Sequence, residues 1–428
     1  MLKIQFKQIF RGHFERFQQK KSGYDTDYYT EVIEKMLNCA EKENGYAKYM
    51  CMECGEEKIV PFTCKSSFCL SCARIRLEEW LSKIEDTLFD EVEYRHVVLT
   101  VPEALRVYFY REPEKLDCLI KSGMEMLKDL MEQVHGGTIE FGYIVVLQTA
   151  GRSGTYNPHL HIMMTAGGLD DQDNWHDIEY IPFSLLHKKW QYYLFEMMKV
   201  EFSDKVKFLI DKLYRKYPRG IVAHIKMDKV PKREKLAKYL IKYVGSPPIA
   251  LSRIINYDGK KVKYWYRDHR TNKREVAEVS VLIFIGRMVQ HILPKGFKKV
   301  RYYGLHATCK AKKVAKKLKV IFINIGRKVI KSLFAKEKKE EKKRSYRDRI
   351  MEMTGEDPFR CPNCGSEMIL WKIWVPGYGI IYSELEEMKN GKYERLEWEQ
   401  ESKEEGTESS GGGSSLYRGR KKVQLSLW

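Results

Sequence analysis

The sequence predicts an α+β protein in which helices cover an antiparallel sheet. Two observations support this class. Short apolar segments of strand length are mixed with segments of helical pattern, and two strand segments are joined by a Gly-, Ser-, Asn- and Pro-rich connection that favours a hairpin. Strands that return through hairpins pair antiparallel, so we expect one sheet domain over residues 91–290.

The region before the sheet domain is expected to hold helices and a small cysteine-rich domain. Residues 1–45 are polar and have a helical pattern, so they form an N-terminal helical segment. Residues 46–90 hold closely spaced cysteines and end in a short helix over 79–90, where apolar residues recur at helical spacing. We expect 46–90 to be a zinc-binding domain.

The elements of the sheet domain follow in order along the chain. Strands are expected at 95–102, 141–148, 159–165 and 220–226, with further antiparallel strands over 255–285. Helices are expected at 116–133 and 183–214, together with a basic helix at 232–244 that stops at Gly245-Ser-Pro-Pro248.

The last third of the chain divides by charge and composition. Residues 291–350 begin with basic and aromatic residues and continue as a lysine-rich, proline-free helix from about 308 to 349. We expect this stretch to be a basic DNA-binding helical region. Residues 351–398 form a module around a Cys-x-x-Cys pair, and the Gly- and Ser-rich tail 399–428 is expected to be disordered.

The charge of the chain indicates a polyanionic partner. With 77 Lys and Arg against 58 Asp and Glu, the net charge is +19, and +16 of it falls between Lys295 and Arg344. A charged run can also be a solvated helix face, but the imbalance of sign favours contact with phosphates. Nucleic acid is therefore the first candidate and a membrane surface the second, while a small neutral metabolite is disfavoured as substrate.

Two absences in the sequence bear on location. No apolar run approaches the ~20 residues of a membrane-spanning helix, so we expect no membrane insertion. The N-terminus lacks the apolar stretch of a secretory signal, so we expect the protein to stay in the reducing cytoplasm, where disulfides are disfavoured.

Three Cys-x-x-Cys pairs predict metal binding. The pairs Cys51/Cys54 and Cys69/Cys72 are separated by fourteen residues, and two such pairs supply the four thiolates of a tetrahedral structural zinc site. Cys64 lies between them and can replace a ligand or line the site. The alternative is that these cysteines are buried or adventitious thiols.

The third pair is half of a site. Cys361 and Cys364 have no second pair nearby in the sequence, so metal binding there needs help from Cys309 or from another chain.

The segment Pro158-His159-Leu160-His161 is a candidate for a second kind of metal site. On a strand, His159 and His161 point to one face and Leu160 to the other. Gln148, at the end of the strand expected to pair beside them, can add an oxygen ligand, and this set suits catalytic Mg²⁺ or Mn²⁺. The alternative is a pair of hydrogen-bonded core histidines.

A candidate nucleophile lies on the basic helix. Tyr239 and Tyr243 are four residues apart and share one helical face, and Lys238 and Lys242 each precede one of them. A phenol needs nearby positive charge or metal to attack a phosphodiester. Core packing is the alternative for such a pair.

Other basic side chains around these motifs are candidates for phosphate contact. Besides Lys238 and Lys242 they are Arg253, Lys295, Lys298, Lys299 and Arg301. Tyr302 and Tyr303 lie among them and can stack on unpaired bases, or they fill a core.

Taken in order, these motifs resemble the two-tyrosine HUH transposases of the IS91 type. The resemblance covers about residues 46–370 and rests on the cysteine pairs, His159-Leu160-His161, Tyr239/Tyr243 followed by Pro247-Pro248, and the segment His291–Gly304. It implies a ferredoxin-like (RRM-like) antiparallel sheet with helices as the HUH catalytic domain. The Cys361/Cys364 pair resembles a C-terminal cysteine motif of that family.

The resemblance also implies a reaction. His159 and His161 would hold the divalent ion, with Gln148 at the position of a third polar ligand, and Tyr239 or Tyr243 would attack the scissile phosphate. The products would be a 5′-phosphotyrosine and a free 3′-hydroxyl. The implied substrate is the single-stranded DNA of element ends in a prokaryotic cytoplasm, at the nucleoid, and no small-molecule substrate is expected.

Two alternatives remain open at this point. A replication initiator or a relaxase-like nickase would use the same chemistry for another purpose. A non-enzymatic zinc-ribbon protein that binds nucleic acid would leave His159 and His161 as packed residues.

Overall fold

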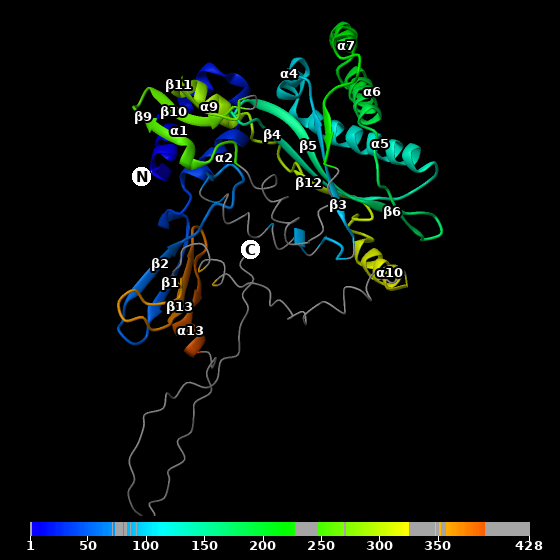
Figure 1. The fold of residues 1–428 in the computed structure, drawn as a ribbon. Helices are drawn as coiled ribbons and strands as arrows, with labels where there is room; N and C mark the ends of the chain where they lie inside the picture. The colour runs from blue at the N-terminus through cyan, green and yellow to red at the C-terminus, as the bar shows by residue number, and fades with distance from the viewer. Residues whose placement is uncertain are drawn as a thin grey trace, which may run out of the picture. The chain divides into compact units, whose positions relative to one another are not determined.

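The computed structural model (Figure 1) describes residues 2–70, 72, 80, 84–85, 87–90, 92–226, 247–268, 271–324, 347, 351 and 357–389. The chain divides into two compact units, residues 1–382 and 383–428. In the second unit the described part is a short helix, α13 (Glu384–Lys389). All other elements treated below belong to the first unit, and the predicted α+β class is confirmed by their mixture of antiparallel sheets and helices.

The central element is a five-stranded sheet whose strands are all antiparallel to their neighbours, in the order β12-β4-β5-β3-β8. The expected hairpin is confirmed, because β4 and β5 pair directly. The strands are β3 (Tyr94–Thr100), β4 (Gly142–Ala150), β5 (Tyr156–Thr165), β8 (Ala223–Ile225) and β12 (Val300–Gly304).

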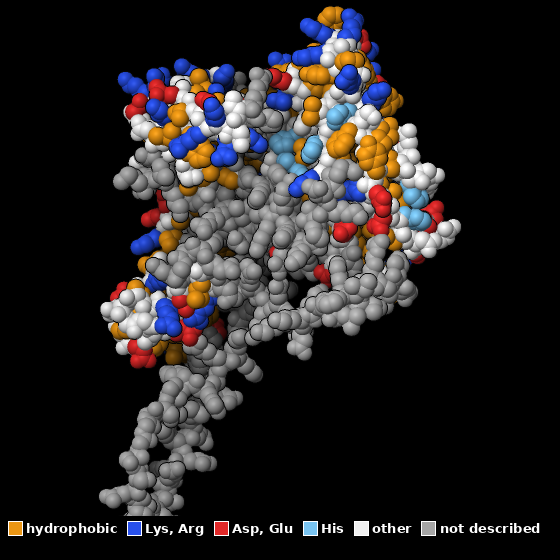
Figure 2. Space-filling model, viewed as in Figure 1, with side chains coloured by type: hydrophobic (Ala, Val, Ile, Leu, Met, Phe, Trp, Pro, Cys, Tyr) orange, Lys and Arg blue, Asp and Glu red, His pale blue; other side chains and the backbone are white. Residues whose placement is uncertain are grey.

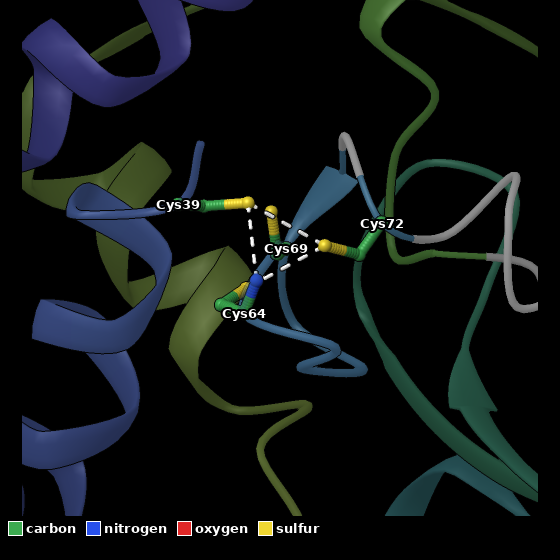
Figure 3. Close-up of side chains that lie close together, drawn as sticks. All are labelled: Cys39, Cys64, Cys69 and Cys72. Carbon is green, nitrogen blue, oxygen red and sulfur yellow. Dashed lines mark hydrogen bonds between the residues drawn. The ribbon is translucent and has the colours of Figure 1, made fainter. Parts of the chain in front are cut away.

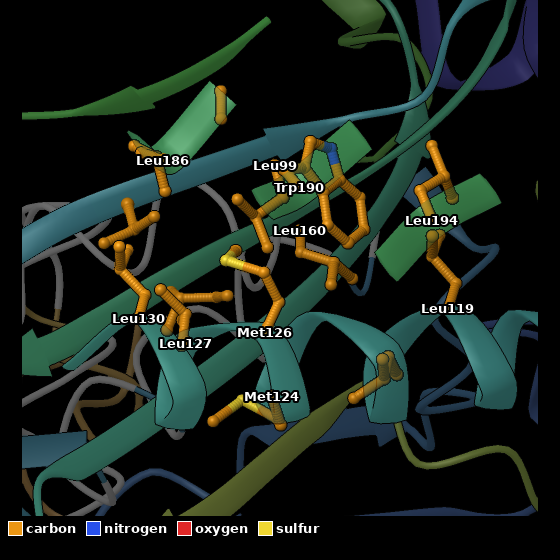
Figure 4. Close-up of a cluster of buried hydrophobic side chains, with 14 of the residues drawn as sticks. Leu99, Leu119, Met124, Met126, Leu127, Leu130, Leu160, Leu186, Trp190 and Leu194 are labelled. Atoms are coloured by element: carbon orange, nitrogen blue, oxygen red, sulfur yellow. The ribbon is translucent and has the colours of Figure 1, made fainter. Parts of the chain in front are cut away.

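Helices cover one face of this sheet. Helix α5 (Leu116–His135) and helix α6 (Phe183–Phe202) bury leucine, methionine and tryptophan side chains against Leu99 and Leu160 of the strands (Figure 4). The burial of this apolar surface stabilises the sheet at roughly 25 cal/mol per Å². Helices α4 (Glu103–Arg111) and α7 (Asp204–Lys216) extend the same layer.

The opposite face of the sheet is divided between apolar and polar side chains. At one end, helix α10 (Ala311–Asn324) packs Leu318 and Phe322 in one cluster with Val146 and Met163 of the strands. At the other end the strands present histidine, glutamine and threonine side chains. Because side chains alternate along a strand, the packing of α5 and α6 determines which residues face this polar end.

A second layer joins the N-terminal helices to a three-stranded sheet of order β11-β10-β9. Helices α1 (Leu2–Lys20), α2 (Asp27–Leu37) and α9 (Val281–Val289) share one buried cluster with this sheet. Its strands are β9 (Ile254–Tyr257), β10 (Lys261–Arg267) and β11 (Arg274–Ser280).

The prediction of strands over 255–285 is therefore wrong at its end, where α9 begins. The side chain of Ser280 accepts a hydrogen bond from the amide of Ile283 (3.4 Å), which is an N-cap. The apolar run from Val281 fits a strand or a buried helix equally well by sequence, and Phe284, Ile285, Met288 and Val289 are buried at helical spacing.

A four-stranded sheet combines two regions that were expected to be separate modules. Its order is β14-β13-β1-β2, with β1 (Tyr46–Cys51), β2 (Glu57–Pro61), β13 (Met368–Val375) and β14 (Gly379–Ser383). Tyr46 pairs with Trp374, and Cys51 with Met368. The sequence predicts separate modules at 46–90 and 351–398. It does so because β1 and β13, the two strands that pair, lie about 320 residues apart in the sequence.

Smaller elements complete the described chain. Strands β6 (Gly167–Leu169) and β7 (Trp175–Asp177) form a two-stranded sheet. Short 3-10 helices lie at Ser22–Tyr24, Lys42–Asn44, Pro113–Lys115 and Leu251–Arg253.

Several helix predictions differ from the structure or fall outside the described residues. The expected helix 183–214 is interrupted at Ser203, whose φ of 52° is left-handed, so α6 ends there and α7 begins. The expected basic region 291–350 contains strand β12 of the central sheet, and within its described residues helix α10 covers Ala311–Asn324 of the expected helix. The basic helix 232–244, residues 325–346, residues 79, 81–83 and 86 of the expected helix 79–90, and the tail lie outside the described residues. In the described part, no helix is long and apolar enough to cross a membrane.

The end of β12 gives a stability prediction. Gly304 has a φ of +58°, and a Cβ there would lie 1.8 Å from the carbonyl oxygen of Phe141. We expect Gly304→Ala to lower the free energy of unfolding by about 3 kcal/mol or more, measured by chemical denaturation, because strain and a backbone clash add. The control Gly12→Ala, which meets nothing within 4 Å in helix α1, should leave stability unchanged or slightly raised. Equal stability of the two variants would contradict the β12 pairing.

Candidate functional site

Four cysteines form a compact cluster beside the N-terminal helices. The sulfur atoms of Cys39, Cys64, Cys69 and Cys72 all lie within 4.8 Å of one another (Figure 3). Cys72 Sγ is 3.5 Å from Cys39 Sγ and 3.6 Å from Cys64 Sγ. A tetrahedral zinc ion with Zn–S bonds of ~2.3 Å places its sulfurs about 3.8 Å apart, so this cluster fits Zn²⁺.

This cluster is part of a hydrophobic core. Cys39, Cys69 and Cys72 are buried with phenylalanines of α1 and α9, while Cys64 is half-buried. The pKa of Cys39 is lowered to about 7, and the largest cause is a hydrogen bond from the Cys64 thiol. A lowered pKa favours the thiolate, which is the form that binds metal. Zinc here would therefore stabilise the packing of α1 and α2 as well as the loop after β2.

A second cluster joins the two ends of the first unit. Cys51, Cys54, Cys361 and Cys364 also have all four sulfurs within 4.8 Å of one another, with Cys51–Cys364 at 3.4 Å and Cys54–Cys361 at 3.5 Å. Cys54 and Cys364 are exposed, and the other two are buried.

The two halves of this cluster have the same backbone structure. The amide of Gly55 donates to the carbonyl of Cys51, and the amide of Gly365 donates to the carbonyl of Cys361, both at 3.0 Å. Both glycines have positive φ, 72° and 76°, which favours glycine. Each half is thus the tight turn that presents two thiolates, and the pair forms a zinc ribbon with β1 and β13.

The expectation that Cys51/Cys54 and Cys69/Cys72 share one site is wrong. Cys51 and Cys54 lie at the turn between β1 and β2, whereas the other pair follows the end of β2, which lies beside the start of β1 at the opposite end of these paired strands. A six-residue strand spans about 17 Å or more, which separates the two pairs. Cys64 is indeed a neighbour of Cys69 and Cys72, and the Cys361 pair is completed by Cys51/Cys54 rather than by Cys309.

A cleft of about 1710 Å³ lies over the polar end of the central sheet. Its walls come from strands β3, β4, β5 and β8, the loop around Cys64, and the segment 291–300. Figure 2 shows histidine side chains gathered in a hollow with Lys and Arg side chains around it. The site residues that line it are His96, Thr100, Gln148, His159, His161 and His224.

Strand register brings these side chains to one face. His159 of β5 lies opposite Gln148 of β4 and Thr100 of β3, and His161 lies opposite Val98. His224 of β8 also lies opposite Val98. Residues that face each other in an antiparallel sheet point to the same side, as the sequence predicted for Gln148, His159 and His161.

Hydrogen bonds orient the imidazoles. His159 Nδ1 lies 2.7 Å from the carbonyl oxygen of Asn157, and since a carbonyl can only accept, Nδ1 is the donor. In the neutral ring, Nε2 then carries the free lone pair. His161 Nε2 is 3.2 Å from Gln148 Oε1, and His161 Nδ1 is 3.0 Å from His96 Nε2. The rings of His159 and His161 have centroids 4.8 Å apart.

Burial keeps these imidazoles neutral. Burial is the largest cause of the lowered pKa values of His159 and His161, and it is also the largest cause that lowers the pKa of His96 to about 4. Neutral imidazole is the form that ligates metal. Among the described residues, the groups of three or more His, Cys, Asp or Glu whose ligand atoms all lie within 4.8 Å of one another are the two cysteine clusters, so the histidines of the cleft do not form such a group by themselves.

Apart from Arg301, the predicted phosphate-binding residues divide into three groups. Arg253, Lys298 and Lys299 line the cleft. Lys295 borders a neighbouring depression of about 450 Å³. Lys238 and Lys242 lie outside the described residues.

Arg301 does not fit the expected role. It lies opposite Val145, so it faces the helix-covered side of the sheet, and it pairs with Asp117. Its neighbours Tyr302 and Tyr303 pack against buried clusters on opposite faces of the sheet, which favours core packing over base stacking.

Tyr239 and Tyr243 also lie outside the described residues. The nearest described residues on both sides of that segment, Lys226 and Pro247, line the cleft. The chain that carries both tyrosines therefore leaves and re-enters the described structure at this cleft.

Sequence reasoning missed Cys39, His96 and His224. Cys39 stands alone in the sequence, without a second cysteine at a metal-binding spacing. His96 and His224 each stand alone within a predicted strand. Side chains alternate between the two faces of a strand, and this alternation could have found both histidines. His96 shares a strand face with Thr100, and His224 shares one with Lys226, and both of these residues line the cleft.

Two protein-family models match parts of this chain. Residues 142–313 match the family model described as "Putative transposase", and residues 9–101 match the model "Transposase zinc-binding domain". The first range includes Gln148, His159 and His161, and the second includes all four cysteines of the first cluster but only half of the second cluster.

Two bacterial proteins are similar over most of their length. The "Transposase for insertion sequence element IS801" of Pseudomonas savastanoi pv. phaseolicola is 27% identical over 361 residues, covering 80% of this chain and 83% of the relative. The "Putative transposase y4qJ" of Sinorhizobium fredii is 25% identical over 375 residues, covering 83% of this chain and 92% of the relative. No solved structure matches this chain.

The cysteine geometry predicts two zinc ions per chain. We expect Cys361→Ser to reduce the content to one zinc by native mass spectrometry, and Cys39→Ser to remove the other zinc. Cys39→Ser should also lower the melting temperature more, because Cys39 is buried in a large core.

The matched control is Cys118→Ser, since Cys118 lies outside both clusters. It should keep two zinc ions. A chain that holds one zinc and keeps it in Cys361→Ser would contradict the zinc ribbon formed by both ends of the unit.

Proposed function

We propose that the chain is a transposase of the IS91 type with an N-terminal zinc-binding domain, and that it cleaves and rejoins single-stranded DNA through a covalent 5′-phosphotyrosine. The observation that carries this proposal is the face of the central sheet where Gln148, His159 and His161 meet in a cleft with basic side chains.

The chemistry of the donor set fits a hard divalent cation. We propose that His159 Nε2, His161 Nε2 and Gln148 Oε1 hold Mg²⁺ or Mn²⁺, since two imidazoles and one amide oxygen leave positions for water and phosphate. The ion would polarise the scissile phosphate, which is Lewis-acid chemistry.

His96 is a positioning residue in this proposal. If His161 offers Nε2 to the ion, its Nδ1 carries the proton and donates to His96 Nε2. Such an outer hydrogen bond fixes the tautomer and the ring orientation of a ligating histidine.

Tyr239 or Tyr243 is the proposed nucleophile. The phenol loses its proton as its oxygen attacks the phosphorus, the bond from phosphorus to the 3′-oxygen breaks, and that oxygen takes up a proton, which leaves a free 3′-hydroxyl and a 5′-phosphotyrosine. Attack by the 3′-hydroxyl of another strand reverses the step and rejoins DNA. The placement of Lys226 and Pro247 in the cleft supports this role.

Basic residues of the cleft would hold the substrate strand. Arg253, Lys298 and Lys299 line the cleft and are proposed to contact phosphates, whereas Arg301 is left out because it pairs with Asp117. The substrate is proposed to be the single-stranded end of an insertion element in the bacterial nucleoid.

The same chemistry would serve a replication initiator or a nickase. Both named relatives are described as transposases, which favours transposition. A marked element that moves only when the chain is supplied would separate these functions.

The tyrosine assignment predicts a covalent adduct. Incubation with Mn²⁺ and a labelled single strand that contains an element end should give a DNA-linked band in denaturing gels. The double variant Tyr239→Phe/Tyr243→Phe should lose this band by at least about 10³-fold, because the attacking oxygen is absent. The control Tyr378→Phe, at an exposed turn, should retain the band. An unchanged band in the double variant would refute the tyrosine mechanism.

The metal assignment predicts how strongly three histidine variants bind Mn²⁺ relative to one another. In isothermal titration of zinc-loaded protein with Mn²⁺, His159→Ala should abolish binding in the cleft, and His96→Ala should weaken it about 10- to 100-fold. The control His135→Ala, half-buried in the last turn of α5 and not among the residues that line the cleft, should bind as wild type. Wild-type Mn²⁺ affinity in His159→Ala would contradict the metal site whether or not DNA is cleaved.

A further inference from the structure

The outer face of the three-stranded sheet is a second feature with the chemistry of a nucleic-acid surface. Along β10, Val262 and Tyr264 are buried toward α1 and α9, so the alternate residues point outward. The outward residues of β10 are Lys261, Lys263, Trp265 and Arg267, and those opposite them on β11 are Ser280, Glu278, Val276 and Arg274.

Arginines gather around one tryptophan at the end of this face. The guanidinium of Arg274 lies 4.6 Å from the centre of the Trp265 ring, and that of Arg253 lies 5.4 Å from it. Trp265 Nε1 donates to the carbonyl of Ser252 (3.1 Å), which fixes the ring. The guanidinium groups lie over the ring, and a base can stack on the ring where a guanidinium turns away from it to contact a phosphate.

Charge on this face is unbalanced. Arg267 and Arg274 lie directly opposite each other in the sheet, and both are exposed. Like charges at such positions destabilise a sheet, and neither arginine forms an ion pair with a carboxylate in the described part of the chain. An anionic partner would relieve this repulsion.

The arginine and tryptophan surface is continuous with the cleft. Arg253 and Arg267 both line the cleft that holds His159 and His161. Arg253 Nη1 also donates to the carbonyl of Arg152 (3.3 Å), in the loop between β4 and β5. Figure 2 shows Lys and Arg side chains on the part of the surface that β9, β10 and β11 occupy in Figure 1.

We propose that Trp265, with Arg253, Arg267 and Arg274, is a binding site for single-stranded DNA that extends the cleft. A base stacks on Trp265 and the arginines contact the neighbouring phosphates. The ligand is single-stranded because the bases of a duplex are already stacked on each other. The inference rests on the proposed DNA-cleaving function, and it concerns how the strand is held outside the site of cleavage.

The test measures binding of a fluorescent 30-nucleotide single strand, and of its duplex, to the full zinc-loaded chain by anisotropy. We expect Trp265→Ala to weaken single-strand binding about 5- to 100-fold and duplex binding less than about 2-fold. Arg274→Ala should weaken single-strand binding and reduce its salt slope by about 0.7, the effect of one phosphate contact.

Two further variants separate stacking from folding. Val276→Ala, which truncates the exposed partner of Trp265 on the same face, should bind like wild type. Trp265→Phe keeps an aromatic ring and should recover most of the affinity. Wild-type affinity in Trp265→Ala, or equal loss in Trp265→Phe and Trp265→Ala, would overturn the proposal.

The outcome is separable from that of the proposed function. Trp265→Ala should still form the tyrosine adduct at saturating DNA, because Trp265 touches no reacting group in the proposal. Wild-type protein that binds single strands through Trp265 but forms no adduct would refute the cleavage chemistry and leave the binding site standing.

Discussion

The register of β5 against its two neighbours is the constraint on which the candidate active site depends. Leu160 is buried against the helices, so His159 and His161 on either side of it must face the cleft. A slip of one residue would exchange the two faces and place both imidazoles among leucines. The same apolar packing that stabilises the sheet therefore positions Gln148 opposite His159.

The second cysteine cluster joins segments that lie far apart in the sequence and that share little apolar packing. Among the described residues, Met368 is the one further buried apolar residue in the cluster of Cys51 and Cys361, so this part of the sheet of β1, β2, β13 and β14 has little apolar core. Structural zinc contributes about 10 kcal/mol or more of folding free energy in such modules. The cluster around Cys39 instead strengthens a core that α1, α2 and α9 already provide.

Features encoded locally were predictable from the sequence, and those that depend on distant pairing were not. The hairpin of β4 and β5 and the shared face of His159 and His161 follow from period two and turn composition. The partner of Cys51 was not predictable, because Cys-x-x-Cys pairs are alike and the correct one lies about 310 residues away. His96 gave no motif, since its role depends on which strand lies beside β5. The roles of Tyr239 and Tyr243 stay predictions, as these residues lie outside the described structure.

The measurement that tests the central claim most directly is the chemical identity of the linked residue. Wild-type protein would be trapped on a single-stranded element end with Mn²⁺, digested with protease and nuclease, and sequenced by tandem mass spectrometry. The account predicts a nucleotide attached through a 5′-phosphate to Tyr239 or Tyr243. A nucleotide on any other residue, or cleaved DNA without a protein-linked nucleotide, would contradict it.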